Sequence, residues 1–187
     1  MTFDLSLPAR GSTLRLEFAP DTGWPGSGAG VAAGTARIVP VANGDGGVEL
    51  PVTALTVEGL LDALVAIGAK GIAGETTRVV VDDTLFVCIG LGDADAIDDD
   101  AVRRAYGSAA RSLEGVERAV ASTEFGTNPV VEGLLLGGYT YSGFKSQGAE
   151  AKASDSTRAS ADTNESTSVN ATVTVVAPEA EREAFER

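Results

Sequence analysis

The chain has 187 residues, of which 43% are hydrophobic and only 5% aromatic, so it is long enough for one domain with a mainly aliphatic core. Its formal net charge is −13. A field of that sign repels phosphate backbones and anionic membrane surfaces, so we expect neither nucleic acid nor a membrane as a partner. Histidine is absent, which excludes His-based catalytic triads and His-ligated zinc from this chain but leaves all-carboxylate metal sites open.

A single cysteine, Cys88, lies inside an apolar run. It excludes an internal disulfide and fits a reducing compartment, and a small buried side chain is the simplest interpretation of it. The N-terminus does not combine a charged start, an apolar middle and a cleavage site, and no apolar stretch approaches membrane length. We therefore expect a soluble cytoplasmic protein.

The first predicted elements are two strands separated by a glycine-rich loop. Residues 13–19 alternate apolar and polar side chains, which predicts a strand. The passage 23–34 is predicted to be a loop, and residues 35–41 a second strand. Proline cannot donate to a strand ladder, so Pro40 predicts an edge or strand-end position. The apolar face of the first strand is formed by Leu14, Leu16 and Phe18.

A helix and a hairpin are predicted next. Apolar residues recur at helical spacing over about 56–67, and Gly68 can end that helix. The β-rich runs 77–81 and 84–89 are separated by Asp82-Asp83, which predicts a tight hairpin. The second run is apolar nearly throughout, as expected of a central strand covered on both faces.

The clearest predicted helix covers about 98–114. Asp98, Asp99 and Asp100 lie at its start, where carboxylates interact favourably with the helix dipole. A short strand at 117–122 and a helix from about Pro129 follow, because proline at a first helical position costs no hydrogen bond. The buried stripe of the 98–114 helix is predicted to be Val102, Ala105, Tyr106, Ala109 and Leu113.

The last part of the chain starts with a polar tract at 147–168 that contains no aromatic or large aliphatic residue, which predicts a flexible surface loop. Residues 169–176 predict a strand, and Pro178 opens a helix that would continue past residue 187, so we expect a polypeptide that has been cut. Strands and helices alternate throughout, which predicts an α/β fold with a mixed β-sheet flanked by helices on both faces.

Two glycine-containing loops are candidates for cofactor binding. Gly28, Gly30 and Ala33 match a relaxed dinucleotide fingerprint, but the following strand leaves no room for the helix that this fingerprint must open. Gly90 and Gly92 are better placed, between a buried strand and a helix. The carboxylates that follow would repel a phosphate, so a tight turn that leaves the sheet is the simpler interpretation, and we assign no cofactor site.

Acidic residues could form a metal site. Asp93, Asp95 and Asp98 to Asp100 could together bind a divalent cation through oxygen atoms. Their spacing does not match a calcium loop, and a solvated helix start explains them more simply. Asp82-Asp83 is most simply a turn. We assign no metal ligand in this chain.

The segment 128–146 could hold an acid, two phenols and a base, namely Glu132, Tyr139, Tyr141 and Lys145. No partner nucleophile or metal-ligand set accompanies them, so they do not form a catalytic constellation. Packing is the simpler interpretation of Tyr139, which follows Glu132 by seven residues on about the same helix face. We assign no catalytic residue.

Two motifs together resemble the N-terminal domain of the cytosolic leucyl aminopeptidases. The first is a strand that ends in a Gly-x-Gly turn and leads into a helix with an acidic start, here Val87-Cys-Ile-Gly-Leu-Gly-Asp93 and then residues 98–113. The second is a helix with Glu-Gly-x-x-Leu-Gly-x-Tyr and a closing Lys-Ser, here Glu132 to Tyr139 and Lys145-Ser146. The resemblance extends from about residue 35 to residue 177.

The resemblance implies a macro-like α/β fold and a parent enzyme that removes N-terminal amino acids from peptides. It also implies two divalent metal ions, zinc or manganese, in a C-terminal catalytic domain, and a hexamer. The family's metal-binding residues and its Asn-Thr-Asp-Ala-Glu-Gly-Arg motif would lie beyond residue 187, so no catalytic residue is carried over. This chain departs from the family in the glycine-rich insert near 23–34 and in the long polar tract.

The resulting hypothesis is a non-catalytic domain over 1–177, with 178–187 starting the helix that leads to the catalytic domain. Its role would be oligomer assembly and control of access to the active site. The alternative is a stand-alone macro-like module that binds ADP-ribose or a related nucleotide. A third possibility is a purely structural interaction domain.

Overall fold

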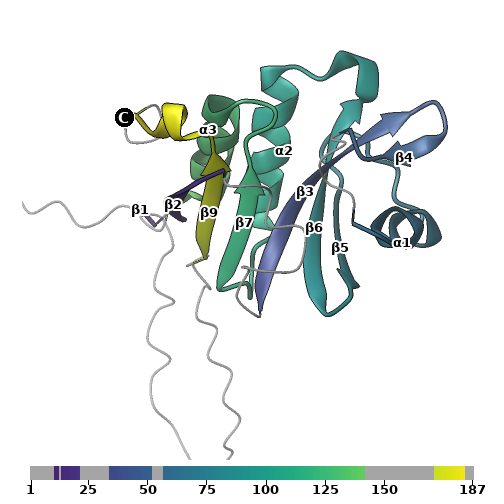
Figure 1. Ribbon diagram of the computed structural model, residues 1–187, viewed down its shortest axis with the longest axis horizontal. Coiled ribbons are helices and arrows are strands. Elements are labelled where there is room, and N and C mark those ends of the chain that lie inside the picture. Colours follow the sequence, from purple (N-terminus) through teal and green to yellow (C-terminus); the bar gives the residue numbers. More distant parts are fainter. Residues whose placement is uncertain (1–10, 13, 22–33, 52–56, 142–170, 184–187) are drawn as a thin grey trace, which may run out of the picture.

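The computed structural model describes residues 11–12, 14–21, 34–51, 57–141 and 171–183 (Figure 1). Within them the chain forms a seven-stranded mixed sheet, a separate two-stranded ladder, and helices on both faces of the main sheet. The elements in chain order are β1 (Gly11–Ser12), β2 (Arg15–Pro20), β3 (Thr35–Gly44), β4 (Gly47–Glu49), α1 (Leu60–Ala66), β5 (Thr76–Val81), β6 (Thr84–Asp93), η1 (Ala94–Ala96), α2 (Asp99–Arg111), β7 (Arg118–Ser122), α3 (Thr127–Gly138), β8 (Thr140–Tyr141), β9 (Thr172–Ala177) and η2 (Glu179–Glu181).

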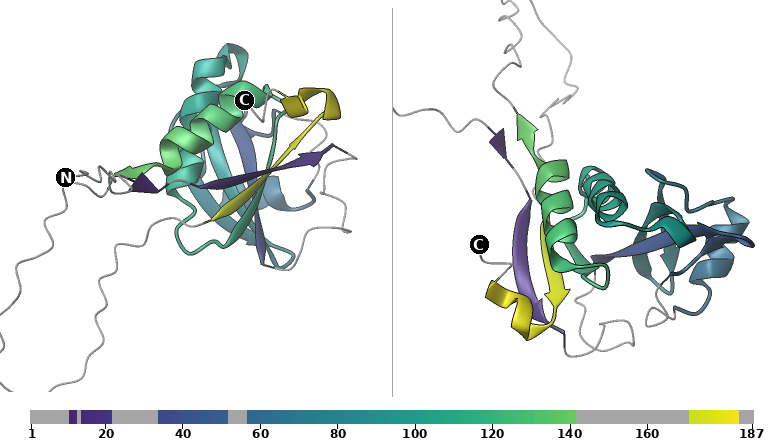
Figure 2. Two further views of the ribbon diagram at one scale, coloured as in Figure 1. Left: turned by 90° about the vertical axis from the view of Figure 1, so that its left-hand side faces the viewer. Right: turned by 90° about the horizontal axis from the view of Figure 1, so that it is seen from above.

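The main sheet has the order β2-β9-β7-β3-β6-β5, with β4 paired to the end of β3. Five neighbouring strands, β2, β9, β7, β3 and β6, are parallel to one another. β5 and β4 are antiparallel to the strands with which they pair. The sheet is strongly twisted (Figure 2), as sheets of L-amino acids are. The prediction of an α/β fold with a mixed sheet is confirmed.

The two faces of the sheet form separate cores because side chains alternate along each strand. On β3, Ile38 belongs to the core beneath α2 and α3, whereas Val39 belongs to the core beneath α1. On β6, Val87 faces the first core and Phe86 the second. The prediction that β6 is a central strand covered on both faces is therefore confirmed.

Two features predicted from the local sequence, the glycine that ends α1 and the Asp82-Asp83 turn, have the expected geometry. After α1, the Gly68 N–H donates to Val65 O at 3.0 Å and the Ala69 N–H to Leu64 O at 3.0 Å, and Gly68 has a φ of 77°. This is the paired hydrogen-bond pattern of a glycine C-cap. Between β5 and β6, Asp82 and Asp83 both have positive φ, 46° and 58°, as a two-residue type I′ hairpin turn requires.

The predicted position of Pro40 is wrong. β3 is a central strand between β7 and β6 rather than an edge strand, and Pro40 lies inside it, opposite Ile89 of β6. On the other side, pairing with β7 ends at Ile38 and pairing with β4 starts at Ala42. The proline therefore occupies the break between two partners, where the missing N–H leaves the ladder intact.

Other predictions are confirmed, with shifts of a few residues at the element ends. The five residues predicted for the buried stripe of α2 are all buried. The strands predicted at 13–19, 117–122 and 169–176 correspond to β2, β7 and β9. The predicted loop at 23–34 and the polar tract at 147–168 lie outside the described residues, apart from Gly34. No helix in the described part of the chain is long and apolar enough to cross a membrane.

Candidate functional site

Gly90 and Gly92 lie within β6, against the loop 71–75. The Gly90 N–H donates to Glu75 O at 2.8 Å, and the Gly92 N–H donates to Gly71 O at 3.0 Å. A Cβ on Gly90 would overlap the carbonyl oxygen of Ile72, and Gly92 has a φ of 97°. Because both N–H groups already have backbone acceptors, the contacts favour a packing role for these glycines over anion binding. The other glycine candidates, Gly28, Gly30 and Ala33, lie outside the described residues.

The acidic residues after β6 act as helix caps and ion-pair partners. Asp93 accepts a hydrogen bond from the Asp95 N–H at 3.1 Å, and Asp98 accepts one from the Ala101 N–H at 2.7 Å at the start of α2. Asp100 pairs with Arg103 and Arg104, each at 2.7 Å. No group of three or more His, Cys, Asp or Glu side chains that could hold a metal ion occurs among the residues the structure describes.

An acidic pocket of about 340 Å³ lies where β3 and β6 end. The carboxyl ends of parallel strands are the usual ligand-binding edge of an open α/β sheet. Here that edge is lined by carboxylates, which oppose the binding of a nucleotide phosphate. The acidic members of the lining are Asp45, Glu49, Asp93 and Asp95.

Residues 127–138 form α3, which crosses α2 at very short range. A Cβ on Gly133 would stand 2.5 Å from the carbonyl oxygen of Arg103, and a Cβ on Gly137 would overlap the carbonyl oxygen of Gly107. The next glycine, Gly138, instead packs against the side chain of Leu14, which precedes β2. The glycines of the motif Glu-Gly-x-x-Leu-Gly therefore serve helix packing.

The structure describes only part of the possible acid, phenol and base cluster, namely Glu132 and Tyr139. Glu132 pairs with Arg103 at 2.8 Å on the surface. Tyr139 ends α3 and is 53% exposed, so packing does not account for most of its side chain. Tyr141 lies in β8, where the structure describes the backbone but not the side chain, and Lys145 lies outside the described residues.

Two buried titratable side chains, Cys88 and Tyr106, contribute to packing and hydrogen bonding within the fold. Cys88 is buried between the sheet and α1, and burial raises the pKa of its thiol to about 12, so it is neutral and a poor nucleophile at neutral pH. The hydroxyl of Tyr106 donates to Ser122 O at 3.0 Å and joins α2 to the end of β7. Burial raises the pKa of Tyr106 well above its usual range.

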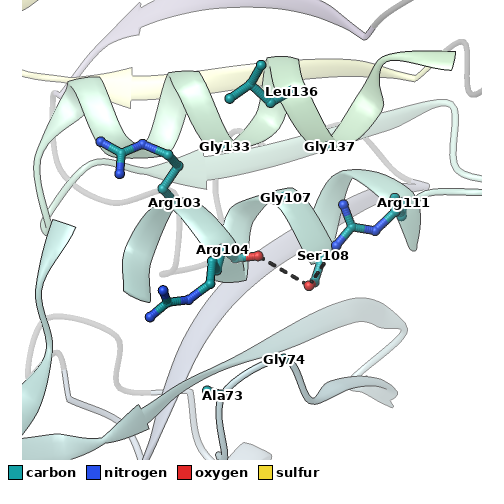
Figure 3. A pocket seen from close by; sticks show the side chains of 10 residues that line it. All are labelled: Ala73, Gly74, Arg103, Arg104, Gly107, Ser108, Arg111, Gly133, Leu136 and Gly137. Atoms are coloured by element: carbon teal, nitrogen blue, oxygen red, sulfur yellow. Dashed lines mark hydrogen bonds between the residues drawn. The ribbon is translucent and has the colours of Figure 1, made fainter. Parts of the chain in front are cut away.

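A groove lined by arginines, which was not predicted from the sequence, lies over α2. It has a volume of about 450 Å³ and lies between α3 and the loop that contains Ala73 and Gly74 (Figure 3). Arg103, Arg104 and Arg111 extend into or along it from α2. The spacing of Arg104, Gly107, Ser108 and Arg111 at i, i+3, i+4 and i+7 could have indicated this face.

Comparison with known proteins agrees with the fold. Residues 38–148 match the model of the cytosol aminopeptidase family, N-terminal domain. A mutant of tomato leucine aminopeptidase superposes with a TM-score of 0.54 at 13% identity, over 95% of this chain and 36% of that one. The bottromycin maturation enzyme BotP gives a TM-score of 0.51 at 19% identity, over 81% of this chain and 29% of that one. These structures show the likeness of fold alone.

Curated relatives agree with the family match. A protein of Corynebacterium diphtheriae named "probable cytosol aminopeptidase" is 40% identical over 157 residues, which are 79% of this chain and 30% of that protein. A Streptomyces coelicolor protein with the same name is 34% identical over 146 residues, 69% of this chain and 28% of that protein. The chain thus spans less than a third of the length of these relatives. It belongs to the cytosol aminopeptidase family and corresponds to the N-terminal domain of that family.

Proposed function

We propose that this chain is the non-catalytic N-terminal domain of a metal-dependent leucyl aminopeptidase, which removes N-terminal amino acids from peptides. The match of residues 38–148 to the family's N-terminal domain carries this proposal. The parent's chemistry would belong to the 70% of the C. diphtheriae relative that the match leaves uncovered. In this account residues 1–177 are the domain and 178–187 begin the helix that leads to the catalytic part.

We assign the metal ions to that catalytic part as well. Two divalent ions, zinc or manganese, would activate water and polarise the peptide carbonyl there. A solved form of the similar enzyme BotP is described as a complex with Mn, which supports manganese as a candidate. The histidine-free composition and the structural roles of Asp93, Asp98 and Asp100 support the absence of a ligand set from this domain.

The domain's role in the parent would be to support assembly of a cytoplasmic hexamer and to frame access to the active site. Exposed apolar side chains one turn apart on α1 support an assembly surface: Leu61 is 38% exposed and Val65 is 61% exposed. Exposed apolar residues that gather on one face are typical of interaction sites. Changing both Leu61 and Val65 to glutamate in the parent should convert hexamers to smaller species in sedimentation velocity. Unchanged hexamers would contradict this surface.

A domain exchange tests the proposal. Residues 1–177 would replace the aligned N-terminal part of the C. diphtheriae relative. The chimera is expected to hydrolyse a leucyl amide in the presence of added Mn²⁺ and to lose this activity with a chelator. A chimera that is folded and soluble but inactive, beside an active parent, would contradict the assignment.

The stand-alone nucleotide-binding module is less well supported. The edge of the sheet where such a module would bind a nucleotide carries the carboxylates of Asp93 and Asp95. The N–H groups of Gly90 and Gly92 are already hydrogen-bonded to the backbone. Titration calorimetry with ADP-ribose separates the two proposals: saturable binding would favour the module, and no heat of binding agrees with the aminopeptidase domain.

A further inference from the structure

The groove over α2 has no part in the proposed function. No segment of the described chain covers it. Its volume of about 450 Å³ falls in the range of ~300–1,000 Å³ that is usual for ligand sites. α2 forms its floor, with Gly133, Leu136 and Gly137 of α3 along one side and Ala73 and Gly74 along the other (Figure 3).

Its shape follows from the sequence of α2. Arg104, Gly107, Ser108 and Arg111 occupy one helix face, so two small residues lie between two arginines. The arginines are seven positions apart in the helix, which is about 10 Å along the axis at ~1.5 Å per residue. The groove therefore has an arginine from each end of a shallow floor, and the Arg111 guanidinium group reaches back to the Ser108 hydroxyl at 3.1 Å.

Gly107 does not need to be glycine for packing. A Cβ there would stand 3.4 Å from the Gly133 carbonyl oxygen and 3.7 Å from an Arg111 nitrogen, both ordinary contact distances. This differs from Gly133 and Gly137, whose added Cβ atoms would collide with the backbone of α2. The missing side chain at position 107 keeps the floor of the groove open.

The groove carries an excess of positive charge on a chain whose net charge is −13. Arg103 pairs with Glu132 at 2.8 Å and shares Asp100 with Arg104. Arg111 instead donates to the hydroxyl of Ser108 at 3.1 Å, and it forms no salt bridge with a carboxylate in the described part of the chain. Three guanidinium groups are thus matched by two carboxylates.

We propose that this groove binds an acidic peptide segment in which two carboxylate side chains flank an apolar one. A planar guanidinium group binds carboxylates with two parallel hydrogen bonds, which suits Arg104 and Arg111. Leu136, 72% exposed beside the floor, provides an apolar contact for the middle residue. In a peptide of polyproline II conformation, carboxylates three residues apart lie on one face and about 9 Å apart at ~3.1 Å per residue, close to the separation of the arginines.

The arrangement favours a peptide over a free phosphate or a small dicarboxylate. The two arginines lie at opposite ends of the floor instead of converging on one point, so a single compact anion would reach only one of them. Leu136 and Ala73 would gain nothing from a fully polar ligand, whereas they lose water-exposed apolar surface against an aliphatic side chain.

The test uses a fluorescein-labelled, amidated peptide of sequence Gly-Glu-Leu-Ala-Glu-Gly and a second peptide with glutamine in place of both glutamates. Fluorescence anisotropy with the whole chain should show saturable binding of the acidic peptide that weakens as salt is added. The glutamine peptide should bind about tenfold or more weakly, the loss expected for a charge-assisted contact.

Three variants locate the binding. Arg111→Gln should weaken binding about tenfold. Arg118→Gln removes the same charge from an exposed position on β7 outside the groove and should leave binding unchanged. Gly107→Ala should weaken binding while its melting temperature stays equal to or above that of the unmodified chain, because alanine favours a helix.

The proposal is overturned if both peptides bind equally, if no saturable binding occurs at millimolar peptide, or if Arg111→Gln and Arg118→Gln have the same effect. Sedimentation velocity of the chain without peptide gives a further contrary outcome. Self-association that Arg111→Gln abolishes would assign the groove to a second copy of the chain instead.

Discussion

At the scale of single residues, glycines decide how closely the helices approach. Gly133 and Gly137 let α3 lie directly on the backbone of α2, and Glu132 pairs across the same crossing with Arg103. The sequence motif could be predicted as a family marker, but the close approach could not. A glycine required by a backbone contact looks the same in a sequence as one required by a turn.

The first prediction concerns this crossing. Helix propensity alone would make Gly137→Ala stabilising by about 1 kcal/mol. Because the new Cβ would overlap the Gly107 carbonyl, we expect instead a net loss of about 1–3 kcal/mol in the free energy of unfolding, typical of overpacking. Urea titration measures it. Gly46→Ala, where a Cβ would meet nothing within 4 Å, is the control and should change stability little.

The second prediction concerns pH. Burial, and then the nearby charge of Asp21, raise the pKa of Glu124. A carboxyl with a raised folded-state pKa binds its proton more tightly in the folded chain, so its contribution to stability falls as pH rises above the usual carboxyl value of about 4.3. Glu124→Gln should therefore raise the melting temperature at pH 7 and change it little near pH 4. An equal shift at both pH values would contradict this cause.

At the scale of elements, the sequence predicted strands and helices well where apolar spacing was strong. α2, β6 and the hairpin around Asp82-Asp83 occur as expected because periodicity and turn residues are local signals. Pro40 shows the limit of such signals. Its position depends on which strands meet β3 on either side, and that arrangement is decided by packing between distant segments.

The third prediction tests the hairpin turn. Asp83 has a φ of 58°, which costs an L-residue energy that glycine avoids. Asp83→Gly should stabilise the chain by about 0.5–1 kcal/mol in urea unfolding. Asp99→Gly, in the first turn of α2, is the matched control and should be destabilising by about 1 kcal/mol. Destabilisation by both changes would argue against a type I′ turn.

At the scale of the whole molecule, the groove could not be predicted from the sequence, whereas the family could. The sequence around Arg104 and Arg111 carries no local sign that α3 and the 73–74 loop border their helix face. The family could be identified because its motifs follow one another in order along the chain, and the match over residues 38–148 confirms it.

The central claim is that this chain is an N-terminal domain without chemistry of its own, and hydrolysis by the isolated chain tests it most directly. Purified chain would be incubated with a leucyl amide and with Mn²⁺ or Zn²⁺, beside the full-length C. diphtheriae relative under the same conditions. We expect hydrolysis by the relative and no rate above background for the chain. Metal-dependent hydrolysis by the chain, retained through further purification and abolished by a chelator, would contradict the account.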